Sequence, residues 1–231
     1  MSGPVIKICG VRSPEIAQVV AECGADLMGL IFAPSRRKVS PEQARRIVAG
    51  FPESINSRPG VVGVFVNERV EVMNEFSDAV ALDFVQLSGD EPPEVQSEIS
   101  RRVIRALRLA SGTSVDEACR LAEQYLDCAT PASALLLDTD VAGSYGGNGI
   151  QGDWEVARHL AERYPIILAG GLRPETVGDA LSTVQPFGVD VSSGVETDGT
   201  KDATKIRRFI ETARAVSVES RTHVLLRSSS R

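Results

Sequence analysis

The chain has 231 residues, of which 42% are hydrophobic and 24% are charged, and its formal net charge is −6. This composition is typical of a globular protein, and the acidic balance argues against nucleic-acid binding, which requires a basic surface. No apolar run approaches the roughly 18 residues of a membrane span, and residues 1–4 do not open a secretory signal. We therefore expect a cytoplasmic protein whose partner is neither nucleic acid nor membrane.

Four widely spaced cysteines, Cys9, Cys23, Cys119 and Cys128, form no Cys-x-x-Cys pair. The pattern therefore does not predict a zinc site. A chain of this length buries a large core without disulfides, so we expect four reduced thiols. Cys9 differs from the others because it ends an apolar run and is followed by a glycine.

Short apolar runs typical of strands alternate with amphipathic segments typical of helices along the whole chain. The predicted strands are residues 5–9, 26–32, 61–66, 84–87, 103–107, 134–138, 166–169 and 188–191. The predicted helices begin near residues 13, 40, 68, 92, 115, 153, 174 and 202. Two of them open with Ser-Pro-Glu, in which the serine is the N-cap and the proline takes the first helical position.

Eight consecutive β-α units indicate parallel strands joined by right-handed crossovers. Such units build either a closed (β/α)8 TIM barrel or an open doubly wound sheet. Candidate functional residues follow the first, sixth, seventh and eighth strands, and only a barrel brings the first strand beside the eighth. We therefore predict an α/β barrel over residues 1–215, followed by a short polar tail, residues 216–231, that we expect to be flexible.

Glycine-rich turns follow the seventh and eighth predicted strands. The first contains Gly171, and the second contains Ser193 and Gly194. Glycines let the backbone approach an anion closely, and many barrels bind a phosphate group after these two strands. A third glycine-rich loop, residues 146–149, includes Gly147 and is suited to close over the phosphate. The alternative for each loop taken alone is an ordinary turn.

Cys9 and Asp138 each end an apolar strand and form a candidate acid–base pair. The carboxyl ends of parallel strands meet at one edge, where barrel enzymes have their active sites. A thiol and a carboxyl group can divide proton donation and acceptance if their surroundings tune their pKa values. The alternatives are a buried structural thiol for Cys9 and a turn-forming or N-cap role for Asp138.

Seven short blocks occur in an order that resembles the phosphoribosylanthranilate isomerase family. They are residues 7–10, 29–32 with Ser35 and Arg37, 62–67, 85–87, 137–139, 169–172 and 190–196. The resemblance extends over about residues 5–215. Each block alone is modest, but the ordered set is specific to this family of barrel enzymes of tryptophan biosynthesis.

The resemblance implies an Amadori rearrangement that needs no cofactor and no metal. The substrate would be the phosphosugar N-(5′-phosphoribosyl)anthranilate, and the product would be 1-(2-carboxyphenylamino)-1-deoxyribulose 5-phosphate. Asp138 would be the general acid that opens the ribose ring. Cys9 would be the general base that removes the C2′ proton.

The resemblance also assigns the binding residues. Arg37 would bind the anthranilate carboxylate, for which a guanidinium group is suited because it binds bidentately. Asp190 would help to position the substrate. The phosphate would be held by Gly147, Gly171, Ser193 and Gly194.

Two positions leave questions open. Ser88 stands where the family often has histidine, and Arg36 precedes Arg37, so the carboxylate-binding residue is ambiguous by one position. Spacing to the Ser-Pro-Glu segment at 40–42 favours Arg37, for which the alternative is a solvated charge in the run 36–38. Arg36 is expected to be a surface arginine without a buried partner.

Alternative functions are a non-catalytic phosphosugar-binding barrel or another phosphate-binding enzyme, such as indole-glycerol-phosphate synthase or a ribulose-phosphate epimerase. The synthase usually needs lysines at strand ends, and metal-dependent epimerases need histidine ligands. His159 and His223 lie in a predicted helix and in the tail, which argues against a metal site. The sequence leaves open whether the protein is a monomer or a homodimer.

Overall fold

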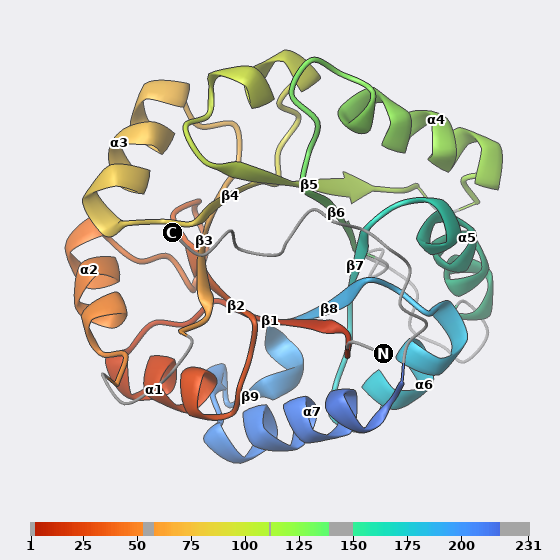
Figure 1. The fold of residues 1–231 in the computed structure, drawn as a ribbon. Coiled ribbons are helices and arrows are strands. Elements are labelled where there is room, and N and C mark those ends of the chain that lie inside the picture. Colours follow the sequence, from red (N-terminus) through yellow and green to blue (C-terminus); the bar gives the residue numbers. More distant parts are fainter. Residues whose placement is uncertain (1–2, 53–57, 111, 139–149, 218–231) are drawn as a thin grey trace.

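The computed structural model describes residues 3–52, 58–110, 112–138 and 150–217, and its centre is a closed barrel of parallel strands (Figure 1). Neighbouring strands pair in chain order, and β1 closes the ring by pairing with β8. The predicted TIM barrel is therefore confirmed. The barrel strands are β1 (Val5–Cys9), β2 (Leu27–Ile31), β3 (Gly60–Phe65), β4 (Phe84–Leu87), β5 (Arg102–Arg108), β6 (Ala134–Asp138), β7 (Ile166–Ala169) and β8 (Gly188–Val191).

Helices surround the barrel as an outer ring (Figure 1). They are α1 (Pro14–Glu22), α2 (Pro41–Ala49), α3 (Val70–Val80), η1 (Pro93–Glu98), α4 (Val115–Leu126), α5 (Ile150–Arg163), α6 (Val177–Val184) and α7 (Ala203–Ala215). The two Ser-Pro-Glu segments begin α1 and α2 as predicted, because Ser13 and Ser40 accept hydrogen bonds from the backbone N–H groups of Ile16 and Gln43.

Three helices differ from the prediction, and one of them, α5, begins at Ile150 rather than near residue 153. The segment after β4 is a short 3-10 helix, η1, whose first turn closes with a hydrogen bond from Val95 N to Pro92 O, 3.1 Å long. Such i→i+3 bonds suit a segment of only six residues. Helix α6 begins at Val177 rather than near 174, because the Thr176 hydroxyl accepts a hydrogen bond from Arg173 N and forms a turn before the helix.

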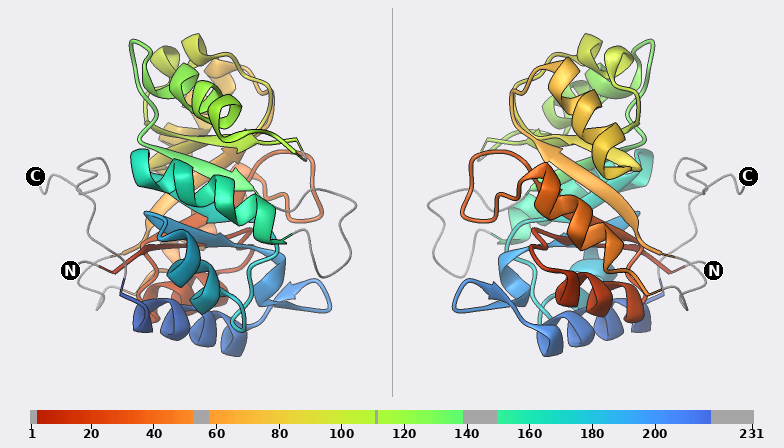
Figure 2. Two further views of the ribbon diagram at one scale, coloured as in Figure 1. Left: turned by 90° about the vertical axis from the view of Figure 1, so that its right-hand side faces the viewer. Right: turned by 90° about the vertical axis from the view of Figure 1, so that its left-hand side faces the viewer.

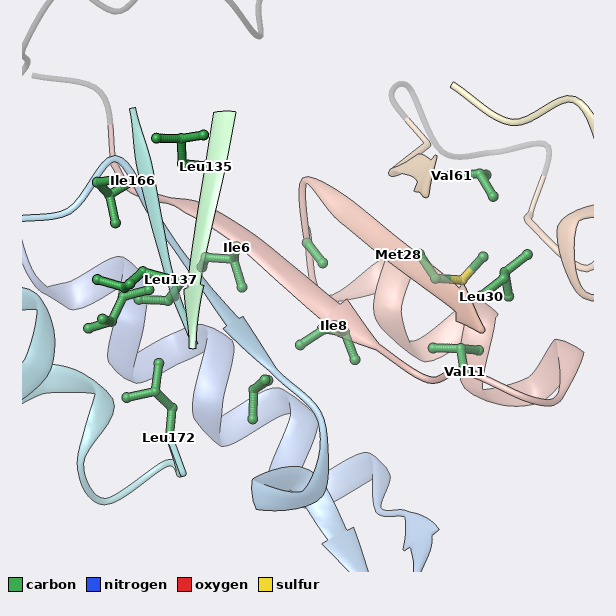
Figure 3. Packing of buried hydrophobic residues seen from close by; sticks show 14 of the residues in the cluster. Ile6, Ile8, Val11, Met28, Leu30, Val61, Leu135, Leu137, Ile166 and Leu172 are labelled. Atoms are coloured by element: carbon green, nitrogen blue, oxygen red, sulfur yellow. The ribbon is translucent and has the colours of Figure 1, made fainter. Parts of the chain in front are cut away.

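Side chains alternate between two faces of every strand and form two packed layers. Ile6 and Ile8 project from β1 toward the helices, as Leu135 and Leu137 do from β6 (Figure 3). The opposite faces of the strands fill the barrel interior with a second cluster: Leu27, Val62, Phe84, Ile104, Ala134, Leu136, Ile167 and Ala169. The interior is thus a packed core that also contains the buried polar side chains of Lys7, Gln86 and Asp190.

A small antiparallel hairpin after β8 was not predicted. It consists of β9 (Glu196–Thr197) and β10 (Thr200–Lys201), preceded by the one-turn helix η2 (Ser193–Val195). The hairpin extends from one end of the barrel, where it is drawn in blue (Figure 2). It brings charged residues into the neighbourhood of the strand ends.

Within the part of the chain that the structure describes, no helix is long and apolar enough to cross a membrane. Helix α7 ends at Ala215. Most of the segment predicted to be a flexible tail, residues 218–231, lies outside the described residues, and so does Gly147 in the loop 139–149.

Candidate active site

Cys9 lies at the carboxyl end of β1 on the face that points into the barrel. Its residue surface is 6% exposed. The adjacent position on β2 is Gly29, which pairs with Cys9 in register. A Cβ atom at Gly29 would lie 2.9 Å from the Cys9 sulfur, so only glycine leaves room for the thiol at this position.

A buried ion pair lies one layer below the thiol. Lys7 on β1 is fully buried, and its Nζ is 2.8 Å from Oδ1 of Asp190 on β8. The barrel register makes these two residues direct neighbours. Burial lowers the pKa of Lys7, but the charges and hydrogen bonds of Asp190 and Cys9 raise it overall. A lysine held protonated in the barrel interior therefore lies beside the thiol.

Charges on several elements act on Cys9. Burial raises the pKa of the thiol, Lys7 and Lys201 lower it, and Asp190 raises it; the net result is a raised pKa. Arg37 also interacts electrostatically with the thiol. The two lysines favour the thiolate that a general base requires, whereas burial opposes it.

Asp138 ends β6 with an exposed side chain, and it shares its strand face with Leu136 of the barrel interior. Its neighbours in register are Arg108 on β5 and Ala169 on β7. Asp138 and Cys9 therefore both project toward the same open end of the barrel, from β6 and β1. Their roles as acid and base stay predictions.

Four charged residues meet at the hairpin. Nε and Nη2 of Arg37 lie 2.6 and 3.0 Å from the two carboxylate oxygens of Glu196, Nη2 of Arg36 lies 2.7 Å from Glu196 Oε2, and Nζ of Lys201 lies 3.0 Å from Oε1. Burial raises the pKa of Glu196, but the hydrogen bonds from Arg37 and Lys201 outweigh it and lower the pKa to about 2. Glu196 is thus a permanently charged carboxylate at neutral pH.

The prediction that Arg36 is a surface arginine without a buried partner is wrong as to the partner. Its side chain is 56% exposed, but it binds Glu196, whose side chain is 5% exposed. The hairpin accounts for this contact, since it returns Glu196 toward the loop after β2. Arg37, with a side chain 18% exposed, is the more buried of the two arginines.

The loops after β7 and β8 approach each other closely. Gly171 has a φ of +60°, and a Cβ atom at Gly194 would lie 1.8 Å from the carbonyl oxygen of Leu172. Ser193 lies beside Gly194 in η2. The Ser192 hydroxyl donates a hydrogen bond of 3.2 Å to the carbonyl oxygen of Cys9. The structure therefore brings Gly171, Ser193 and Gly194 together beside the end of β1.

The end of β4 carries Gln86 and Ser88. Gln86 Nε2 donates a hydrogen bond of 2.9 Å to the Ser88 hydroxyl, and Arg108 contacts the Ser88 carbonyl oxygen. Within the described residues, Oε1 of Gln86 has no hydrogen-bond partner. The serine that replaces the family's frequent histidine is thus bound to a neighbouring side chain.

Sequence reasoning missed the roles of Lys7, Glu196 and Lys201. A lysine inside the apolar run of β1 is a signal of a paired, buried cation, because an unpaired charge there is costly. Glu196 and Lys201 gave no such signal because their positions depend on the hairpin. Across the described ranges, no group of three or more His, Cys, Asp or Glu residues is placed to hold a metal ion.

A thiol, two carboxylates and several cations at the carboxyl end of a closed eight-stranded barrel define a (β/α)8-barrel enzyme. Residues 6–212 match the family described as N-(5'phosphoribosyl)anthranilate (PRA) isomerase. The chain belongs to this family of isomerases of tryptophan biosynthesis.

Individual relatives agree. An N-(5'-phosphoribosyl)anthranilate isomerase of Roseiflexus sp. (strain RS-1) is 43% identical over 92% of this chain and 98% of its own length. One from Geobacter metallireducens is 42% identical over 91% of this chain and 98% of its own. The crystal structure of phosphoribosyl anthranilate isomerase from Thermotoga maritima covers 92% of this chain and 100% of its own, with a TM-score of 0.77 and 38% identity.

Two further similar structures carry information in addition to the fold. One, with a TM-score of 0.75 and 36% identity, covers 92% of this chain and 100% of its own; it is a complex with reduced 1-(o-carboxyphenylamino)-1-deoxyribulose 5-phosphate. Another contains monomers generated from the dimeric Thermotoga maritima enzyme, with a TM-score of 0.74 and 35% identity over 92% of this chain and 100% of its own.

Proposed function

We propose that this chain converts N-(5′-phosphoribosyl)anthranilate to 1-(2-carboxyphenylamino)-1-deoxyribulose 5-phosphate, with Asp138 as general acid and Cys9 as general base. The observation that carries this proposal is the placement of the two side chains at one end of the barrel, on β6 and β1. Substrate and product are isomers, so the reaction needs proton transfer and no net oxidation.

In the first step, Asp138 donates a proton to the ribose ring oxygen. The C1′–O bond breaks, its electron pair stays on the protonated oxygen, and the amine nitrogen donates electrons to C1′ to give an iminium ion. The exposed position of Asp138 suits a group that must meet the substrate and regain a proton afterwards.

In the second step, the Cys9 thiolate removes the C2′ proton. The electrons of the C–H bond form a C1′–C2′ double bond and neutralise the iminium nitrogen. The resulting enolamine takes up a proton at C1′ and loses one from its C2′ hydroxyl, which gives the ketone. Lys7 and Lys201 support this role because their charges favour the thiolate.

The two anionic ends of the substrate have separate binding groups in this proposal. Arg37 binds the anthranilate carboxylate, and the loops that contain Gly171, Ser193 and Gly194 bind the phosphate; the predicted phosphate contact of Gly147 lies outside the described residues. Asp190 orients the sugar hydroxyls while its Oδ1 stays on Lys7. The close contact of the β7 and β8 loops supports a phosphate cradle, since it brings two glycine-rich turns into one small region.

The proposal also covers partners and domain organisation. The partner is a small phosphosugar, the active unit is residues 1–215, and the chemistry does not need residues 216–231. The protein acts in the cytoplasm as a monomer or a homodimer. A relative bound to the reduced product supports the phosphosugar partner, and a dimeric relative supports the homodimer.

A direct assay tests the proposal. Purified protein should consume the fluorescent substrate N-(5′-phosphoribosyl)anthranilate, and Asp138→Asn should lower turnover steeply while a reduced product analogue still binds, because the amide keeps the shape but delivers no proton. A wild-type protein that binds the analogue without turnover would instead be the non-catalytic barrel. Loss of folding in Asp138→Asn would assign the residue a structural role.

A further inference from the structure

The Arg37 guanidinium has two edges that can bind a carboxylate, and one of them is occupied. The side edge consists of Nε and Nη2, and the terminal edge consists of Nη1 and Nη2. Glu196 binds the side edge, with Nε 2.6 Å from Oε1 and Nη2 3.0 Å from Oε2. Among the described residues, Nη1 makes no hydrogen bond, so the terminal edge retains donors for a second anion.

Glu196 cannot easily turn away from Arg37, because other cations hold it. Nζ of Lys201 is 3.0 Å from Oε1 and also donates a 2.8 Å hydrogen bond to the carbonyl oxygen of Ser192. The backbone of Glu196 is fixed as well, since Lys205 Nζ donates a 2.7 Å hydrogen bond to its carbonyl oxygen. Arg36 adds a contact at Oε2.

Arg37 also lies beside the end of β1. A Cβ atom at Gly10 would be 2.7 Å from Cδ of Arg37, and Gly10 directly follows Cys9. The aliphatic part of Arg37 is thus packed against the backbone next to the thiol, while its side edge is bound by the hairpin. Both constraints fix the direction in which the guanidinium extends.

We propose that Glu196 is a positioning residue, which holds the side edge of Arg37 so that the terminal edge faces the carboxylate of the substrate. The inference rests on the proposed function. Arg36, Arg37 and Lys201 place three positive charges around the single negative charge of Glu196. A second carboxylate that binds there is therefore also paired with positive charge. The competing explanation is that Glu196 occupies the place of the substrate carboxylate and must be displaced.

The two explanations predict opposite changes in affinity for Glu196→Gln. If Glu196 positions Arg37, the neutral amide holds the guanidinium less well, and KM should rise by about 3–10-fold with little change in kcat. If Glu196 competes with the substrate, KM should fall. Steady-state kinetics on the full chain with N-(5′-phosphoribosyl)anthranilate measures both constants.

A double-mutant cycle with Arg37→Ala separates positioning from a general structural effect. In the Arg37→Ala background, Glu196→Gln should leave KM unchanged, because the group on which it acts is absent. Three results for Glu196→Gln would overturn the inference. KM could rise equally in the wild-type and Arg37→Ala backgrounds, it could fall, or it could stay unchanged in both. Absence of wild-type turnover would overturn the proposed function and the inference with it, whereas an active enzyme with an unaltered Glu196→Gln KM overturns only the inference.

A second variant covers the case in which Glu196→Gln does not fold. Glu196→Asp keeps the charge that Lys201 and Arg36 need, but it is one methylene shorter and reaches the Arg37 edge poorly. It should fold and show a similar rise in KM; an unchanged KM would contradict the inference. Glu162→Gln is the control, because it removes an exposed carboxylate that pairs with Arg158 on α5 and should leave KM unchanged.

Discussion

Two buried ion pairs with similar geometry lie on opposite faces of the barrel wall. Lys7 and Asp190 join β1 to β8 inside the barrel at 2.8 Å, and Arg105 and Glu91 meet at 2.6 Å outside it. Arg105 shares the outward face of β5 with Val103 and Leu107 of the outer core. Only the inner pair lies beside the candidate base.

The outer pair, Arg105 and Glu91, holds the backbone of two neighbouring loops in place. Glu91 accepts hydrogen bonds from the N–H groups of Asn67 and Gly89, and Arg105 donates one to the Gly89 carbonyl oxygen while it stacks over Tyr125 at 4.4 Å. It thus ties the loops after β3 and β4 together. The comparison teaches that burial of an ion pair does not itself indicate catalysis; what distinguishes the inner pair is the thiol next to it.

The largest expected effect comes from removal of that thiol. Cys9→Ser should keep the fold and the affinity for a product analogue but lower turnover by about 10²–10⁴-fold, the usual contribution of a general base. Steady-state kinetics and analogue titration measure the two properties. If Cys9→Ser turns over at nearly the wild-type rate, Cys9 is not the general base. The inner ion pair would then not differ from the outer pair by lying beside a catalytic group.

The second effect concerns stability and should be alike for both pairs. Lys7→Met and Arg105→Met each leave a buried carboxylate unpaired, which costs about 3–5 kcal/mol of the free energy of unfolding. Urea unfolding measures this loss. The double variant Lys7→Met with Asp190→Asn should recover part of it, because no unpaired charge remains. If one variant loses much less free energy of unfolding than the other, water reaches the carboxylate left behind and solvates its charge.

The third effect is on substrate affinity at the mouth. Arg37→Ala should raise KM by about 10–150-fold, which corresponds to the loss of a charged hydrogen bond. Arg36→Ala removes a more exposed partner of Glu196, and it should raise KM by less than about fivefold. If Arg36→Ala is the more damaging variant, the carboxylate-binding arginine is Arg36.

The last effect concerns the thiol's proton and needs no change in the substrate site. Because burial raises the pKa of Cys9 above its ordinary value of 9.0, the thiolate fraction is small at neutral pH and grows as pH increases. Alkylation of Cys9 by a small neutral reagent should therefore accelerate by about tenfold per pH unit between pH 6 and 9. Mass spectrometry of the Cys9 peptide measures this rate.

The same measurement compares the two pairs. Lys7→Met removes a positive charge and should slow the alkylation at any given pH, whereas Asp190→Asn removes a negative charge and should accelerate it. Lys201 and Arg37 also face the thiol and remain in both variants. Arg105→Met should leave the rate of Cys9 alkylation unchanged. If Arg105→Met slows alkylation as much as Lys7→Met does, the cause is a loosened structure and not the charge of Lys7.

The barrel and the strand ends could be predicted because their signals are local. Each apolar run carries its own strand, and Cys9 and Asp138 end such runs, so their common edge follows from parallel pairing. The roles of these residues and of Gly147, Gly171, Ser193 and Gly194 stay predictions. The 3-10 geometry of η1 and the hairpin after β8 were missed, since short segments carry weak patterns.

The partners of the charged residues could not be read from the sequence. Lys7 meets Asp190 only because the barrel closes in one register, and Arg36 and Arg37 meet Glu196 only because the hairpin returns toward the loop after β2. Contacts of this kind depend on the whole fold. The error over Arg36 has this origin.

The contact between Lys7 and Asp190 also has a consequence for folding, because it joins residues 183 positions apart. During synthesis β1 is made first and must wait for β8, so the Lys7 ammonium stays hydrated until the ring closes. Contacts between residues so far apart in the sequence form late. Nearly the whole chain must lose conformational entropy before such a contact can stabilise it. We therefore expect the surroundings of the thiol to be completed only when the barrel closes, so recovery of activity during refolding should report barrel closure.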